Sequence, residues 1–373
     1  MRIGIPVEVK DNEHRVAMTP DGVHELARAG HEVRVEAGAG SGSSFDDDAF
    51  AEAGATIVDD ADELWAWSEL VLKVKEPDPS EYHRLRRGLV LFTYLHLAAD
   101  ERTTRAVLDS GVTAVAYETV TGAGGGLPLL NPMSEVAGRL ATQVGANYLM
   151  RAAGGSGVLM GGIPGVRPAR VTVIGGGTSG SEAAYVAAGM GAEVTILDIS
   201  VDRLRLLDQR YPGMFRTLAS NEREVARCVA DSDLVIGAVL VPGAKSPTLV
   251  TSEMVARMRP GSVLVDIAID QGGCFEDSRP TTHSDPVFTA HGATFYCVTN
   301  MPGSVPQTST QGLTNVTLPY VQRLAGDGWR AAMRADAGLA AGLNAHEGVL
   351  TNTGIAEAHG LAEVVTPAEA IRD

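Results

Sequence analysis

The chain has 373 residues, of which 45% are hydrophobic and 20% charged, and its formal net charge is −16 at pH 7. This length exceeds what a single core usually fills, so we expect two domains in a soluble globular protein. Nucleic acid and anionic membranes would repel such a charge, which argues against both as partners but leaves small anionic substrates possible.

The first 131 residues alternate between strand-like and helix-like segments. A helix is predicted at 20–29, and the apolar runs 50–53 and 57–58 continue the alternation. The predicted strands are 2–5, 31–37, 70–74, 89–94 and 112–116. This alternation is typical of a parallel sheet covered by helices.

The region 132–302 is predicted to form a second domain of the same kind, and it opens with a long helix-like stretch, 132–153, suited to bridging two domains. Its strands are expected at 171–174, 193–197, 234–240, 262–269 and 294–298, and its helices at 201–209, 221–230 and 252–258. After residue 302 the chain becomes helical, over 319–335, with too few strands for a third domain. The predicted fold is therefore α/β, with one domain from 1–131 plus 303–373 and another from 132–302.

A glycine-rich segment in the second domain has the pattern of a dinucleotide site. The run Val171-Thr-Val-Ile-Gly-Gly-Gly-Thr-Ser-Gly180 places Gly175, Gly177 and Gly180 at G-x-G-x-x-G spacing between a strand and a helix. The first glycine makes a tight turn, the second lets the pyrophosphate approach backbone, and the third lets helix and strand pack closely. The N-terminus of the helix then favours phosphate.

An acidic residue ends the next strand, as a dinucleotide site requires. Asp198 would accept hydrogen bonds from the adenosine ribose hydroxyls and would repel a 2′-phosphate, which predicts NAD as the cofactor. Arg203, a few residues further on, leaves some room for NADP.

Two strands of the first domain end near polar residues that an apolar run does not need. Lys75 follows one and His96 the other, and Arg15 follows the first strand of the chain. Ligands of open parallel sheets lie outside the carboxyl ends of strands, so these residues could bind a carboxylate and move a proton. The alternatives are a solvated lysine, a core histidine and an ordinary surface arginine.

In the second domain, two acids follow one another in the run Val263-Leu-Val-Asp266-Ile-Ala-Ile-Asp270. Asp266 lies inside the apolar run and is expected to be buried and hydrogen-bonded. Asp270 is expected at the end of the strand, level with the cofactor, unless it only forms a turn with the glycines after it.

Other chemistries find no support in the sequence. Cys228, Cys274 and Cys297 have no metal-ligand spacing, which favours buried thiols in a reducing compartment. No His-x-x-x-His, Cys-x-x-Cys or Gly-x-Ser-x-Gly motif occurs, so neither a metal nor a serine nucleophile is expected. The chain begins with a strand-like run and not a secretory signal, and its longest apolar stretch, 234–241, is too short to cross a bilayer. We expect a cytoplasmic protein with no membrane partner.

Long motifs throughout the chain resemble those of alanine dehydrogenases. They include Arg2-Ile-Gly-Ile-Pro-Val-Glu-Val-Lys-Asp-Asn-Glu-His-Arg-Val-Ala, Leu72-Lys-Val-Lys-Glu-Pro, Leu91-Phe-Thr-Tyr-Leu-His-Leu, Pro132-Met-Ser-Glu-Val-Ala-Gly-Arg, Gly237-Ala-Val-Leu-Val-Pro-Gly-Ala-Lys and Val265-Asp-Ile-Ala-Ile-Asp-Gln-Gly-Gly-Cys-Phe-Glu. The resemblance implies two doubly wound, Rossmann-like parallel-sheet domains with the active site in the cleft between them, and a homo-hexamer.

The same resemblance assigns roles to residues. Arg15 and Lys75 would bind the substrate carboxylate, His96 would be the acid/base, and Asp270 would assist at the carbinolamine step. The NAD site would comprise Ser134, Gly175, Gly177, Thr178, Ser179, Gly180, Asp198, Arg203, Ser220, Val239, Leu240, Ile267, Ala268, Ile269, Val298, Asn300 and Met301.

The predicted function is thus NAD-dependent oxidative deamination of L-alanine to pyruvate and ammonium, and its reverse. One alternative is a paralogue that acts on glycine and glyoxylate or another small amino acid, because side-chain selectivity depends on pocket volume. A second is an NAD-binding module like that of the proton-translocating transhydrogenases, which would have no use for Lys75 and His96.

Overall fold

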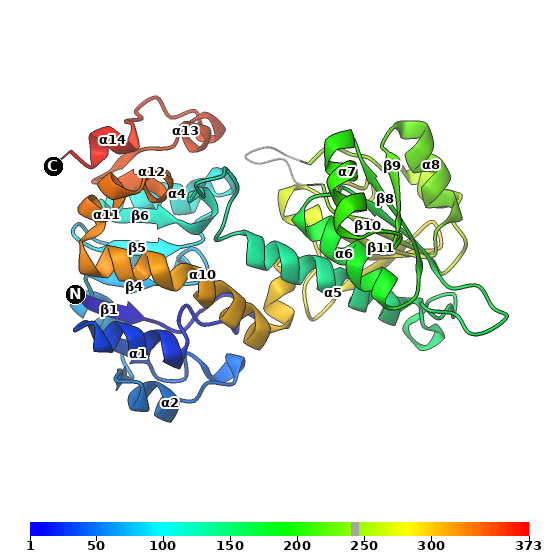
Figure 1. Ribbon diagram of the computed structural model, residues 1–373. Coiled ribbons are helices and arrows are strands. Elements are labelled where there is room, and N and C mark those ends of the chain that lie inside the picture. Colours follow the sequence, from blue (N-terminus) through cyan, green and yellow to red (C-terminus); the bar gives the residue numbers. More distant parts are fainter. Residues whose placement is uncertain (240–245, 373) are drawn as a thin grey trace. The chain divides into compact units, whose positions relative to one another are not determined.

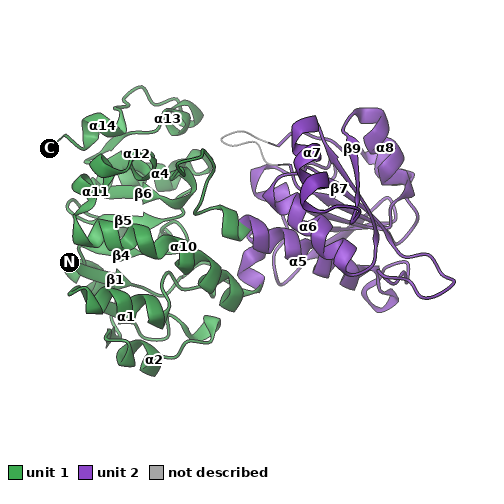
Figure 2. Cartoon of the chain, viewed as in Figure 1, with its two compact units in different colours: residues 1–133, 305–373 green, residues 134–304 purple. Residues whose placement is uncertain are grey.

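The computed structural model describes residues 1–239 and 246–372 and divides the chain into two compact units (Figure 2). Unit 1 comprises Met1–Met133 and Val305–Asp373, and unit 2 comprises Ser134–Ser304. The sequence-based division sets its boundaries after residues 131 and 302.

Unit 1 is built on an eight-stranded sheet with the strand order β15-β14-β6-β5-β4-β1-β2-β3. Strands β1 to β6 run parallel to one another, whereas β14 pairs antiparallel with both β6 and β15. The strands are β1 (Arg2–Ile5), β2 (Glu32–Glu36), β3 (Thr56–Val58), β4 (Leu70–Leu72), β5 (Val90–Thr93), β6 (Thr113–Ala116), β14 (Leu343–His346) and β15 (Val349–Leu350). The last two come from the C-terminal part of the chain.

Helices cover both faces of this sheet (Figure 1). They are α1 (Pro20–Arg28), α2 (Asp47–Glu52), α3 (Ala61–Trp67), α4 (Glu101–Ser110), α10 (Pro306–Gly326), α11 (Trp329–Ala335), α12 (Ala337–Ala340), α13 (Thr353–His359) and α14 (Pro367–Ala370). Val90 and Phe92 of β5 join the core cluster that includes α1 and α10, while Leu91 joins the cluster that includes α3 and α4. Burial on both faces explains why the central strands are continuous apolar runs.

Unit 2 contains a seven-stranded sheet with the order β12-β13-β11-β10-β7-β8-β9, parallel except for the edge strand β12. Its strands are β7 (Arg170–Ile174), β8 (Glu193–Asp198), β9 (Arg216–Ala219), β10 (Leu234–Gly237), β11 (Val263–Asp266), β12 (Val287–Ala290) and β13 (Ala293–Tyr296). Its helices are α5 (Asn131–Leu149), which begins in unit 1, α6 (Thr178–Gly189), α7 (Val201–Arg210), α8 (Glu222–Asp231) and α9 (Ser252–Ala256). The expected α/β class, with two mostly parallel sheets, is confirmed.

Both sheets share one topology, and this topology indicates which loops could bind a ligand. Counted along each unit, the first six parallel strands have the order 3-2-1-4-5-6, which is the doubly wound arrangement. The order reverses between β1 and β4 in unit 1 and between β7 and β10 in unit 2. Ligands of such sheets bind outside the carboxyl ends of the strands at this switch point.

Several predicted element boundaries are wrong. The strand predicted at 262–269 ends at Asp266, because the Asp266 side chain accepts the Ala268 N–H and starts a 3-10 helix at 267–271. The strand predicted at 234–240 ends at Gly237. The helix predicted at 319–335 is two helices, since α10 runs through Pro319 and Gly328, with φ +77°, separates it from α11.

Candidate active site

The three fingerprint glycines of unit 2 differ in their surroundings: the fold itself requires glycine at Gly175 and Gly180, whereas Gly177 borders open space. Gly175 has φ +104°, and a Cβ there would lie 2.7 Å from the carbonyl oxygen of Ala238 at the end of β10. A Cβ on Gly180 would lie 1.8 Å from the carbonyl oxygen of Gly175, so only glycine lets α6 pack this closely on the loop. Around Gly177 an added Cβ meets nothing within 4 Å, which leaves open space beside the backbone. These are the three roles expected of a pyrophosphate loop.

The N-terminus of α6 completes this anion-binding geometry. The helix starts at Thr178, directly after Gly177, which provides no side-chain cap for the N–H groups of the first turn. Ser179 lies in the same turn and is partly buried, as are Gly177 and Thr178. Uncapped first-turn N–H groups at the positive end of a helix favour a phosphate.

Asp198 ends β8 beside this loop and also holds it in place. Its Oδ2 accepts the Gly176 N–H at 2.7 Å, and its Oδ1 accepts the Ser200 N–H at 2.7 Å. Each carboxylate oxygen has a second lone pair, so these bonds leave acceptors for two ribose hydroxyls. Ser220 donates its N–H to the Asp198 carbonyl at 2.9 Å, and the exposed Arg203 lies on the first turn of α7.

The remaining predicted cofactor residues follow strands of the same sheet, except for Ser134, which lies partly buried on α5. Leu240 lies outside the described residues. Val239 follows β10, Ile267, Ala268 and Ile269 lie in the 3-10 helix after β11, and Val298, Asn300 and Met301 follow β13.

Asp266 and Asp270 differ in burial and in role. Asp266 is fully buried and accepts hydrogen bonds from the Ala268 N–H, the Cys274 N–H and the Ser278 hydroxyl, as expected. Burial raises the pKa of Asp266, and these hydrogen bonds offset the rise only in part. Asp270 is exposed and lies in the 3-10 helix, not at the end of the strand as predicted.

In unit 1, Arg15 lies in the segment after β1 and is 2% exposed, so the alternative of a surface arginine is wrong. Its Nε donates to Glu13 Oε1 at 2.7 Å and its Nη2 donates to Glu13 Oε2, while Nη1 lies 3.1 Å from Met133 Sδ. Burial lowers the pKa of Arg15, but the hydrogen bonds and charge of Glu13 outweigh it, and the net direction is upward. Glu13 is not among the residues predicted from the sequence, where its one signal is an acid two residues before the arginine.

A buried ion triad lies beneath the segment that carries Lys75. Lys73 Nζ lies 3.1 Å from Glu8 Oε2 and 3.0 Å from Glu81 Oε1, and all three side chains are at most 2% exposed. Burial lowers the pKa of Lys73, but the two carboxylates outweigh it and leave it raised. Glu8 also accepts the N–H groups of Val74 and Lys75, at 2.5 and 3.3 Å. The sequence signal for this triad is Lys73 itself, a charge inside an apolar run.

Lys75 and His96 share an electrostatic environment around Glu76. Burial raises the pKa of Glu76, but the charges of Lys75, His96 and Lys10 outweigh it and bring the pKa below its usual value. Lys10 also forms an ion pair with Glu76. Lys75 and His96 follow β4 and β5, which are parallel neighbours, so both lie at the carboxyl end of the strands in the sheet of unit 1.

His96 has an unusual backbone conformation. Its φ of 48° and ψ of 32° lie in the left-handed region, and its side chain is exposed. The His96 ring stacks on the ring of Tyr94, with centroids 5.9 Å apart and planes 10° apart. Tyr94 is itself buried and donates its hydroxyl to the Leu129 carbonyl at 2.6 Å. The alternative of a core histidine is therefore wrong.

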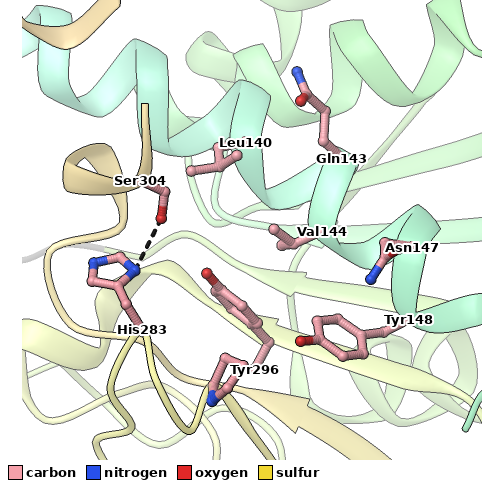
Figure 3. A pocket seen from close by; sticks show the side chains of 9 residues that line it. Leu140, Gln143, Val144, Asn147, Tyr148, His283, Tyr296 and Ser304 are labelled. Carbon is pink, nitrogen blue, oxygen red and sulfur yellow. Dashed lines mark hydrogen bonds between the residues drawn. The ribbon is translucent and has the colours of Figure 1, made fainter. Parts of the chain in front are cut away.

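Unit 2 also contains a pocket of about 340 Å³ that no sequence motif indicates (Figure 3). His283 and Ser304 form a hydrogen bond of 3.0 Å beside it, and burial raises the pKa of Tyr296 to about 12. The polar residues of its lining are Gln143, Asn147, Tyr148, His283, Tyr296 and Ser304. Among the described residues, none of those predicted for the site lines this pocket.

The described part of the chain has neither a metal-binding cluster nor a helix suited to a membrane span. Within residues 1–239 and 246–372, no three His, Cys, Asp or Glu side chains are grouped so that they could hold a metal ion. In the same ranges, no helix has both the length and the apolar character that a membrane span needs.

Comparison with known proteins covers nearly the whole chain. The family models "Alanine dehydrogenase/PNT, N-terminal domain" and "Alanine dehydrogenase/PNT, C-terminal domain" match residues 4–137 and 141–353. The alanine dehydrogenase of Mycolicibacterium smegmatis is 60% identical to this chain, over 96% of the chain and 96% of the relative. That of Mycobacterium tuberculosis is 61% identical, over 95% of the chain and 96% of the relative.

Solved structures give the same result. One named L-alanine dehydrogenase superposes with a TM-score of 0.93 and 48% identity, covering 96% of this chain and 99% of its own. A transhydrogenase from Sinorhizobium meliloti superposes with a TM-score of 0.79 and 26% sequence identity, and the match covers 94% of this chain and 99% of the transhydrogenase chain.

Proposed function

Because the chain belongs to the alanine dehydrogenase family, we propose that it catalyses the NAD-dependent oxidative deamination of L-alanine to pyruvate and ammonium, and the reverse reductive amination. The resemblance inferred from sequence motifs is confirmed, and the protein is an amino-acid dehydrogenase. The observation that carries the proposal for its site is that Arg15 and Lys75 follow β1 and β4, the two strands that flank the switch point of unit 1, and that His96 follows β5, the neighbour of β4.

Within this proposal, two cations of unit 1 bind the substrate carboxylate. Lys75 is partly exposed and supplies a mobile charge. Arg15 is rigid, because Glu13 holds the guanidinium edge formed by Nε and Nη2 and so orients Nη1. Charge-assisted hydrogen bonds of this kind contribute about 1.5–3 kcal/mol each.

The acid–base steps are assigned to His96 and Asp270. A bound nicotinamide would supply the hydride acceptor for the substrate Cα–H bond. The substrate reacts as the free amine after its ammonium has lost one proton to solvent, and the nitrogen lone pair then forms the C=N bond of an iminium. His96 takes a proton from the water that attacks the iminium carbon and passes it to the nitrogen of the resulting carbinolamine. The C–N bond then breaks to release ammonia, the carbinolamine O–H proton passes to solvent as the pyruvate carbonyl forms, and Asp270 assists at this carbinolamine step. Both side chains are exposed in the structure, which supports their access to substrate.

The residues of unit 2 fit a dinucleotide. Gly177 leaves open space where the pyrophosphate would approach, α6 offers uncapped N–H groups, and Asp198 keeps free lone pairs for ribose hydroxyls. Family members use a nicotinamide cofactor, and we propose that it is NAD because the Asp198 carboxylate would repel a 2′-phosphate. The other predicted residues are proposed to line the same site.

The test is an absorbance assay of NADH formation with L-alanine and either NAD or NADP. We expect activity with NAD to exceed activity with NADP, and equal or better activity with NADP would overturn the cofactor assignment.

A panel of amino acids at equal concentration should rank L-alanine first, whereas a preference for glycine or a larger side chain would identify a paralogue. Tight NADH binding without turnover would instead favour a transhydrogenase-like module, the class to which the 26% identical structure belongs.

We also propose a cytoplasmic homo-hexamer. Exposed apolar side chains on unit 2 support an assembly, since Leu159, Ile163 and Val166 are 65%, 60% and 60% exposed. Light scattering coupled to gel filtration should give six times the 38.9 kDa of one chain. Replacing Ile163 and Val166 by aspartate should shift the mass downward if this surface is an interface.

A further inference from the structure

The backbone at His96 needs support from its surroundings. A residue other than glycine in the left-handed region has a strained conformation, which persists only where neighbouring groups fix it. His96 follows the end of β5, and its exposed side chain cannot supply this constraint by packing into the core.

Glu118 supplies the constraint. It lies in the short 3-10 helix Tyr117–Thr119 that follows β6, the strand paired with β5 through Thr93 and Ala116. Its Oε1 accepts the His96 N–H at 2.7 Å and the Leu95 N–H at 3.1 Å, and its Oε2 accepts the Leu95 N–H at 3.2 Å. One carboxylate therefore holds the backbone on which the imidazole is mounted.

We propose that Glu118 is a positioning residue for His96: it fixes the left-handed backbone so that the imidazole is presented to the substrate above the ring of Tyr94. This inference rests on the proposed role of His96 as the acid/base. Glu118 contacts the backbone and not the reacting atoms, so it acts through His96. Displacing a catalytic group by about 1 Å can cost about 100-fold in rate, so a loosened His96 should slow turnover strongly.

A double-mutant cycle distinguishes positioning from a general structural role. Glu118→Ala should lower kcat by about 10- to 100-fold while the Kd for NADH stays unchanged, since unit 2 carries the fingerprint loop. In a His96→Ala background the same substitution should lower kcat by less than about 3-fold, because there is no imidazole left to position. A merely structural role predicts that Glu118→Ala lowers kcat by the same factor in both backgrounds. That result would overturn the proposal.

Two further variants complete the experiment. Asp60 caps α3 in the same unit and also accepts two backbone N–H groups, those of Asp62 and Glu63. Asp60→Ala should lower the melting temperature without changing kcat, and it calibrates the effect of losing such a carboxylate. If Glu118→Ala does not fold, Glu118→Gln replaces it in the double-mutant cycle. The glutamine amide keeps only one acceptor oxygen and places its NH₂ group against a backbone N–H of Leu95 or His96.

The outcomes also separate this inference from the proposed function. A His96→Ala variant with wild-type turnover would remove His96 from the mechanism, and the role of Glu118 would fall with it. A slow His96→Ala variant combined with a near wild-type Glu118→Ala variant would leave the proposed function intact and overturn the positioning role alone.

Discussion

Alanine substitutions at Gly177 and Gly180 should separate cofactor binding from folding. Gly177 has φ −68° and ψ −168°, an extended conformation open to any residue, and an added Cβ has no protein atom within 4 Å. Gly177→Ala should therefore change the free energy of unfolding of the cofactor-free protein by less than about 1 kcal/mol. Its methyl group occupies the space where a pyrophosphate would meet the backbone.

The expected loss of NADH affinity follows from the hydrogen bonds that are displaced. One charge-assisted bond from a backbone N–H to phosphate contributes about 1.5–3 kcal/mol, so losing it raises the Kd for NADH by roughly 10- to 100-fold. Gly180→Ala behaves differently, because its Cβ must move from 1.8 Å to at least 3.0 Å from the Gly175 carbonyl oxygen. Overpacking of this kind typically costs about 1–3 kcal/mol of stability.

Fluorescence titration of NADH gives the Kd, and denaturant unfolding of the cofactor-free protein gives the stability. The reasoning predicts that Gly177→Ala is stable and binds weakly, and that Gly180→Ala is destabilised. A Gly177→Ala protein with wild-type affinity for NADH would show that the pyrophosphate does not approach this glycine. A Gly180→Ala protein that unfolds at the wild-type denaturant concentration would contradict the close packing of α6 on the loop.

Three further predictions concern unit 1. His96→Asn, whose side chain tolerates the left-handed backbone, should lower kcat by about 10² to 10⁴ with an unchanged Kd for NADH, and stopped-flow kinetics with near wild-type rates would remove the imidazole from the chemistry. Lys75→Ala should raise the KM for pyruvate by about 10- to 100-fold as a charge-assisted partner worth about 1.5–3 kcal/mol is lost, and an unchanged KM would place the carboxylate elsewhere. Because the folded-state pKa of Glu76 is lowered from 4.5, its ionisation stabilises the fold above about pH 4.5, and this stability is lost as the pH falls through the lowered pKa. Unfolding curves between about pH 5 and 3 should therefore fall less steeply for Glu76→Gln than for wild type, and parallel curves would refute this coupling.

The sequence predicts those parts of the site that depend on local pattern. Gly175, Gly177 and Gly180 lie within six residues of one another, so their spacing is visible without any tertiary structure. Lys75 and His96 are visible because each follows an apolar run. The two mostly parallel sheets follow from the alternation of strand and helix patterns.

The supporting carboxylates could not be found in this way. Glu8 and Glu118 accept N–H groups from segments far from them in the sequence, and only the order of the strands brings them together. The ends of elements were also poorly predicted where a side chain changes the backbone path. Asp266 is one such case, since it ends β11 inside an apolar run by bonding to the Ala268 N–H.

The discontinuous construction of unit 1 has a consequence for synthesis on the ribosome. The seven strands in the sheet of unit 2 have all been synthesised once residue 296 has emerged. In unit 1, by contrast, β6 must wait for β14, which pairs with it through Leu343↔Val115 and Ala345↔Ala114. Until then β6 is an open sheet edge with unpaired backbone groups, the kind of surface that promotes aggregation. Nascent chains that stall before residue 343 should therefore depend most on chaperones, although the strands of unit 2 have by then been synthesised.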